Sequence, residues 1–65
     1  MKTLYDVQQL LKRFGIFIYT GNRLADLDLM EDEIRELYEY GLIEQSEFAQ
    51  ATLILRNEKR KYKTL

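Results

Sequence analysis

The stretch ELYEYGLIEQSEFAQATLILR, residues 36–56, constrains the fold of this chain more than any other. Apolar residues at helical spacing precede and follow Gly41, and glycine readily adopts the left-handed conformation that ends a helix. With Gly41 just past the C-cap, Leu42 and Leu37 occupy the two positions that meet in a Schellman ending. The stretch therefore predicts an antiparallel helical hairpin with a tight Gly-Leu-Ile corner.

The helix before the corner is expected to cover residues 24–40. Acidic residues are concentrated in its first half, where they suit the positive end of the helix dipole. Asn22 and Asp26 are both competent N-caps, and we favour Asn22. The apolar residues of this helix are spaced by three or four positions along one face, and they are Leu27, Met30, Ile34 and Leu37.

The helix after the corner is expected to cover residues 45–61 and to have a basic C-terminal end. If Glu44 is the N-cap, Ile43 and Phe48 can form a hydrophobic staple across the first turn. Ser46 is the better cap chemically, but a helix that starts there loses the staple. Both starts stay open at this point.

The apolar residues of this third helix exceed what one buried face can hold. Leu53, Ile54 and Leu55 are consecutive, so they cannot all face neighbouring helices. We expect Leu53 to be partly exposed or to meet a partner. The buried stripe is expected to contain Phe48, Ala51, Leu55 and Tyr62.

A first helix is expected over residues 4–14. Thr3 is its N-cap candidate, because the hydroxyl can accept a free first-turn N–H, and Asp6 adds favourable charge. Gly15 can end the helix in the left-handed conformation. The apolar face of this helix consists of Leu4, Val7, Leu10, Leu11 and Phe14.

The stretch GIFIYTGNR, residues 15–23, connects the first two helices and is typical of an extended segment. Side chains alternate along such a segment, which places Ile16 and Ile18 on one side and Phe17 and Tyr19 on the other. One interpretation is that the segment plugs an open end of the core. The other is that one of the two rings stays exposed as part of a contact surface. The two interpretations can coexist.

No other stretch of the sequence has the pattern of an extended strand. The chain has 65 residues, which suits one small domain spanning residues 1–65. The expected fold is therefore all-α: a small three-helix bundle with an extended apolar connector between its first two helices.

Composition excludes several kinds of chemistry. There are no cysteines, so disulfides and thiolate metal sites are excluded, and no histidines, the commonest general base. The three glycines are isolated and match no phosphate loop. We therefore expect no enzymatic activity, no cofactor and no small-molecule substrate. The N-terminus does not have the pattern of a signal peptide, and no apolar run is long enough for a membrane span, so the expected location is the cytoplasm.

Carboxylates on the second helix are candidates for a metal site. Asp28 and Asp32 are i, i+4 neighbours, as are Asp32 and Glu36. Hard cations usually take ligands from several directions, which one helix face seldom provides. We therefore interpret these acids as a solvated face opposite the apolar stripe and expect no metal.

The net charge of −1 conceals a basic, acidic, basic order along the chain. Residues 1–23 carry +3, residues 24–50 carry −8 and residues 51–65 carry +4. If the two basic parts converge around tyrosine rings, they form a groove for single-stranded RNA or DNA, because cations bind phosphates and rings stack on bases. The candidate residues are Lys12, Arg13, Tyr19, Asn22, Arg23, Arg56, Lys59, Arg60 and Lys63.

Other interpretations of these residues stay open. Pairing with the acidic segment can absorb the basic charge, and an isoelectric point of about 5.3 is low for a protein that binds nucleic acid. The chain can instead bind a protein partner, or a second copy of itself, through its acidic second helix and exposed apolar residues. The candidates for that interface are Tyr38, Tyr40 and Leu53.

Three stretches, YDVQQLLKRFGIFIYTGNR, DLMEDEIRELYEYGLI and QATLILRNE, resemble the YqgQ-like family of small uncharacterised cytosolic proteins from Gram-positive bacteria. The similarity covers residues 4–58. It implies a compact three-helix bundle. The function proposed for this family, by structural analogy, is single-stranded nucleic-acid binding, and the resemblance brings no catalytic or ligand residues with it.

Overall fold

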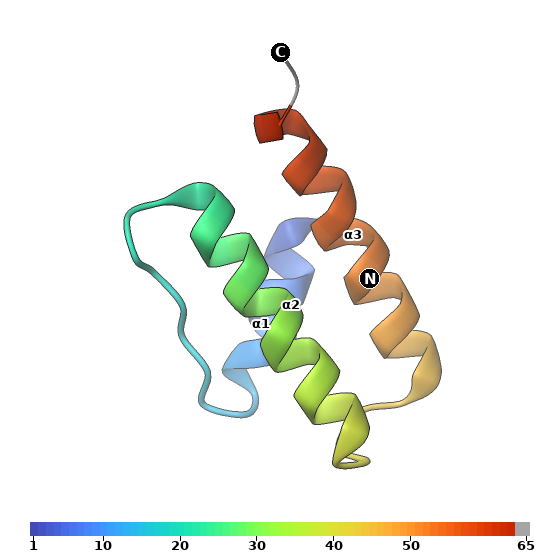
Figure 1. Cartoon of the computed structure of the whole chain (residues 1–65). Coiled ribbons are helices and arrows are strands. Elements are labelled where there is room, and N and C mark those ends of the chain that lie inside the picture. Colours follow the sequence, from blue (N-terminus) through green and yellow to red (C-terminus); the bar gives the residue numbers. More distant parts are fainter. Residues whose placement is uncertain (64–65) are drawn as a thin grey trace.

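The computed structural model describes residues 1–63, without the side chain of Lys63, and contains three helices (Figure 1). They are α1 (Leu4–Lys12), α2 (Arg23–Glu39) and α3 (Gln45–Lys63). Within these residues there is no strand, so the predicted all-α, three-helix architecture is confirmed. Figure 1 shows that α1 and α2 run in the same direction and α3 runs opposite to both. The parallel arrangement is possible because the connector returns the chain along the outside of the bundle.

The first helix begins with the predicted N-cap. The Thr3 hydroxyl accepts from the Asp6 N–H at 3.4 Å, and the Asp6 carboxylate accepts from the Thr3 N–H at 3.1 Å, a reciprocal capping box. The helix ends at Lys12 rather than Phe14, because the chain tightens into a final turn. Gly15 then has φ +75°, as a Schellman ending requires.

The second helix also begins and ends as its local sequence indicates. The Asn22 side chain accepts from the Ala25 N–H at 3.1 Å, which confirms Asn22 as the N-cap. At the other end Gly41 has φ +72°, and the Leu42 N–H donates to the Leu37 carbonyl at 2.8 Å. This is the Schellman bond predicted for the corner, although the Leu42 side chain is exposed.

The start of the third helix favours Glu44 over Ser46 as the N-cap. The helix begins at Gln45, and the Glu44 carbonyl accepts the first helical bond from the Phe48 N–H at 3.0 Å. The Glu44 N–H donates in turn to the Glu47 carboxylate at 2.9 Å. This bond satisfies one backbone donor at the helix start.

The core lies where the apolar faces of the three helices meet. Leu55 and Ala51 of α3 are fully buried, whereas Leu53 is 58% exposed, as predicted from its place in the apolar run. Tyr62 was expected in the buried stripe, but it is 48% exposed. The last turns of α3 project beyond the other two helices in Figure 1, so no helix lies beside Tyr62 to bury it. The buried apolar residues are Val7, Leu10, Leu11, Leu27, Met30, Ile34, Leu37, Ile43, Ala51 and Leu55.

The connector satisfies both interpretations of its alternating pattern. Ile16 and Ile18 are partly buried and pack against the core. Phe17 is 72% exposed and Tyr19 is 88% exposed. The inward side therefore covers the core, while the outward side presents two aromatic rings to solvent.

Candidate functional site

The basic residues of α3 lie beside acidic residues of α2. Lys59 contacts Asp28 at 2.8 Å and also contacts Glu31, while Arg56 lies 3.6 Å from Glu31. Hydrogen bonds to Asp28, and then to Glu31, raise the pKa of Lys59 above its ordinary range. We refer to these four residues as the α2–α3 ion-pair cluster.

This cluster adds to the expectation for the acidic helix. Asp28 was assigned with Asp32 and Glu36 to a solvated face; its side chain is 62% exposed, and it also pairs with Lys59 of α3, as does Glu31. Glu31 is half-buried because the third helix lies against it. The negative charge of α2 and the positive charge of α3 thus largely neutralise each other at this face.

The structure separates the predicted basic residues into different regions. Lys12 and Arg13 are at the end of α1, away from the C-terminal turns of α3 (Figure 1). Arg23 is the first residue of α2. Lys12 and Arg13 therefore do not converge with the basic residues of α3 on one groove. The side chain of Lys63, also a candidate, lies outside the described residues.

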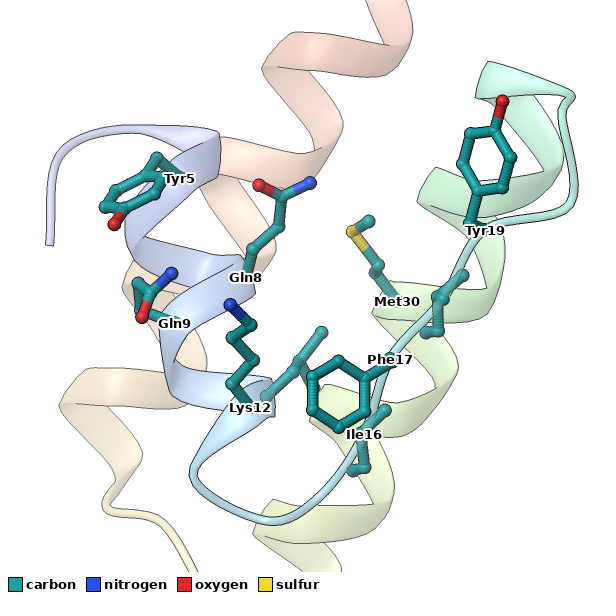
Figure 2. Close-up of a pocket in the computed structure, with 10 residues that line it drawn as sticks. Tyr5, Gln8, Gln9, Lys12, Ile16, Phe17, Tyr19 and Met30 are labelled. Atoms are coloured by element: carbon teal, nitrogen blue, oxygen red, sulfur yellow. The ribbon is translucent and has the colours of Figure 1, made fainter.

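A groove of about 440 Å³ lies between α1 and the connector (Figure 2). Its floor is apolar and includes Leu11 and Met30 from the core and the inward residues Ile16 and Ile18. We call it the α1–connector groove. Its walls are Tyr5, Gln8, Gln9 and Lys12 from α1, and Phe17 and Tyr19 from the connector.

The walls of the groove combine exposed rings with one cation. Tyr5 is 65% exposed, and both connector rings are more exposed still. The Lys12 ammonium lies 6.0 Å from the centroid of the Phe17 ring, at the outer limit of a cation–π contact. No carboxylate lines this groove. The site therefore offers ring faces and positive charge without a competing anion.

The groove continues past Tyr19 toward Arg23. A second hollow of about 360 Å³ shares four residues with the first and is also lined by Gly21, Arg23 and the buried Asp26; the shared residues are Gln8, Ile18, Tyr19 and Met30. Extended backbone rises about 3.3 Å per residue, so residues 16–20 span roughly 13 Å between the two cations. The outward side of the connector thus forms a continuous path with one cation near each end.

Lys12, Arg13 and Arg23 form no ion pair with any other part of the described chain. Arg13 lies apart from the groove, however. It lines another hollow together with Asp6 and Glu47, whose carboxylates oppose its charge. Of the candidate cations, Lys12 and Arg23 are the two that accompany the aromatic rings.

With this geometry described, the chain can be compared with known proteins. The family model described as YqgQ-like matches residues 1–61. The chain belongs to the YqgQ-like family. A relative from Bacillus subtilis (strain 168), described as "Uncharacterized protein YqgQ", is 48% identical over 58 residues, which cover 89% of this chain and 82% of the relative.

The remaining candidate residues of this YqgQ-like chain lie away from the α1–connector groove and in different surroundings. The Asn22 side chain is engaged in its N-cap, and the Tyr38 ring stacks on Phe48 with centroids 4.4 Å apart. Tyr40 and Leu53 are exposed on α2 and α3. Lys61 of the same region pairs with Glu58 at 2.8 Å, and Arg60 is exposed. None of these residues borders the α1–connector groove.

Reasoning from the sequence missed three residues of the site in this YqgQ-like chain. Tyr5, Gln8 and Gln9 were not singled out, because a polar helix edge carries no signal by itself. Tyr5, Gln8 and Lys12 are related by i, i+3 and i, i+7 spacing, which places them along one edge of α1. This helical spacing, together with the outward-facing residues of the connector that follows, was the sequence signal that could have identified this edge of α1 as part of the site.

Over residues 1–63, no group of three or more acidic side chains is arranged to hold a metal ion. None of the three helices in that range combines the length and the apolar character that a membrane span requires.

Proposed function

We propose that this member of the YqgQ-like family is a non-enzymatic protein that binds single-stranded RNA or DNA along the α1–connector groove. One observation carries the proposal. Lys12 and Arg23, which have no ion-pair partner among the described residues, stand near the two ends of a path lined by exposed aromatic rings. Proteins that bind single strands combine cations for the phosphates with rings on which bases stack.

Charge distribution supports this face over the one on α3. Residues 1–23 carry +3, and the two cations beside the groove are not neutralised by neighbours. By contrast, Arg56 and Lys59 are engaged with Asp28 and Glu31. A phosphate approaching α3 must compete with carboxylates already in place, whereas the carboxylate beside the groove path, Asp26, is only 5% exposed and already accepts from Thr20.

The proposal includes a cytoplasmic location and an absence of catalysis or cofactor. The chain has no histidine or cysteine to serve as a general base or nucleophile. Among the described residues, those that line the α1–connector groove include no pair of carboxylates. We therefore propose that this surface binds a ligand without catalysing a reaction.

Fluorescence anisotropy with labelled single-stranded RNA and DNA of mixed sequence tests this function. Binding is expected at low salt, with a steep fall as salt rises, because bound phosphates displace counterions. The double variant Lys12→Glu/Arg23→Glu is expected to weaken binding at least about tenfold and to reduce the salt dependence.

The single variant Lys12→Glu is measured beside the double variant, and Arg13→Glu is its matched control. It changes the charge by the same amount at the neighbouring position on α1, but outside the groove. A smaller effect is expected from it, because charge effects at a distance are screened by salt. Absence of binding at low salt, or equal loss in both variants, would overturn the assignment to this groove.

A protein partner is the second candidate, favoured by the exposure of large side chains away from the groove. Tyr40 and Leu53 lie on α2 and α3 and are both mostly exposed. Exposed aromatic and aliphatic side chains beside charged rims are common at interfaces. Sedimentation of the purified chain, alone and with Leu53→Asp, tests self-association through this surface.

A further inference from the structure

We propose that the α1–connector groove takes one unstacked base of the bound strand, adenine in preference to the other bases, with Gln8 and Gln9 contacting the edge of that base. The inference rests on the proposed function, since the base belongs to a strand held by Lys12 and Arg23. It adds a specific ligand group and two residues that recognise it.

The shape and lining of the groove match a flat heterocycle. Its volume of about 440 Å³ lies within the range of sites that take small ligands. The floor is apolar, through Leu11 and Met30, while amides and a cation stand at the rim. A nucleobase has apolar faces and a polar edge, so it can meet both parts of this lining.

The two amides at the rim are available for recognition. Gln8 and Gln9 are half-buried on α1, and neither side chain forms a hydrogen bond within residues 1–63. Figure 2 shows the Gln8 amide near the opening toward the connector, while the Gln9 side chain projects from the other side of α1, near Tyr5 and Lys12. A glutamine amide presents a donor and an acceptor together, and it pairs with adenine through two hydrogen bonds.

The connector supplies the faces on which the base and its neighbours stack. Phe17 and Tyr19 are two residues apart in extended backbone, so their attachment points are separated by roughly 6.6 Å on the same side. Figure 2 shows the two rings projecting from the connector separately, without stacking on each other. Both rings therefore keep exposed surface for a base.

The test uses a strand of thymidines in which one central nucleotide is thymine, adenine, guanine, cytosine or an abasic sugar. Anisotropy measures the affinity of the full-length chain for each strand at one low salt concentration. The strand with adenine is expected to bind at least about fivefold more tightly than the abasic strand and more tightly than the other three.

Gln8→Ala and Gln9→Ala identify the residues responsible. Each is expected to reduce the preference for adenine, measured as the ratio of the affinities for the adenine strand and the abasic strand. Alanine favours the helix, so α1 is expected to persist. Gln50→Ala, an exposed glutamine on α3, is the matched control and is expected to leave the preference intact. As an independent measurement, the side-chain amide NMR signals of Gln8 and Gln9 are expected to shift when the adenine strand is added.

Several outcomes separate this inference from the proposed function. Equal, salt-dependent affinity for all five strands would overturn the base site and leave strand binding standing. A preference for guanine that is lost in Lys12→Gln would also overturn it, since lysine recognises guanine. If no strand binds at low salt, both proposals fail. If adenosine monophosphate displaces the adenine strand at equal concentration, the base site stands, and the contribution of Lys12 and Arg23 to holding the rest of the strand is overturned.

Discussion

The hydroxyl and the backbone N–H of Thr20 both donate to the same carboxylate oxygen of Asp26, at 2.6 and 2.7 Å. Asp26 lies in the first turn of α2 and is only 5% exposed. The pair ties the end of the connector to the helix that follows it. This attachment fixes the connector immediately after Tyr19, one of the rings that line the α1–connector groove.

Replacement of Asp26 by alanine is expected to lower the free energy of unfolding by about 1–3 kcal/mol, because both Thr20 donors lose their acceptor. Urea unfolding followed by circular dichroism measures this change. Asp32→Ala, an exposed acid on the same helix, is the control and is expected to change stability by less than about 0.5 kcal/mol. Similar losses in both variants would show that Asp26 does not anchor the connector.

Lys59 is expected to make stability depend on alkaline pH. Its pKa is raised in the folded chain by Asp28 and Glu31. A lysine with a raised pKa stabilises the fold fully below its unfolded value, and that stabilisation is lost as the pH rises through the folded value. The stability difference between the natural chain and Lys59→Met is therefore expected to hold near neutral pH and to shrink above pH 10.5.

Urea unfolding of both proteins across this range measures the difference directly. A difference that stays constant well above the ordinary lysine pKa would mean that Lys59 is not paired with α2 in solution. Added salt at neutral pH provides a second check, since it is expected to weaken the more exposed Arg56 contact to Glu31 first.

Glu44→Thr is expected to stabilise the chain by about 0.5–1 kcal/mol, because threonine caps a helix better than glutamate does. The position is the N-cap of α3, just before Gln45. Thermal unfolding followed by circular dichroism measures the gain. Gln45→Thr serves as the control, one residue inside the helix, where no cap is formed and no gain is expected. A loss of stability in Glu44→Thr would argue for a different start of α3.

Leu53→Asp and Leu55→Asp are expected to differ sharply, although the two leucines are neighbours on α3. Leu55 is fully buried, so a carboxylate there is expected to cost about 3 kcal/mol or more. Leu53 is mostly exposed, and its replacement is expected to change stability by about 0.5 kcal/mol or less. Thermal melts of both variants test this. Unfolding by Leu53→Asp would place Leu53 in the core and remove it from any interface.

The helix boundaries were the most predictable part of this protein. Thr3, Asn22 and Gly41 act through hydrogen bonds to residues only a few positions away, so the local sequence contains the information needed to place them. The alternation of side chains along the connector is also determined by the local sequence. It indicated which of its side chains face inward, because successive side chains of extended backbone point in opposite directions.

Sequence by itself therefore determined three helices, their caps and an extended connector with one apolar side. Tertiary structure decided which charges meet and where the groove lies. Lys59 finds Asp28 only because α3 folds back along α2, and Lys12 comes near Phe17 only because the connector turns back beside α1. Such contacts depend on the packing of segments that are distant along the chain, and the spacing of residues by itself does not specify which side chains meet.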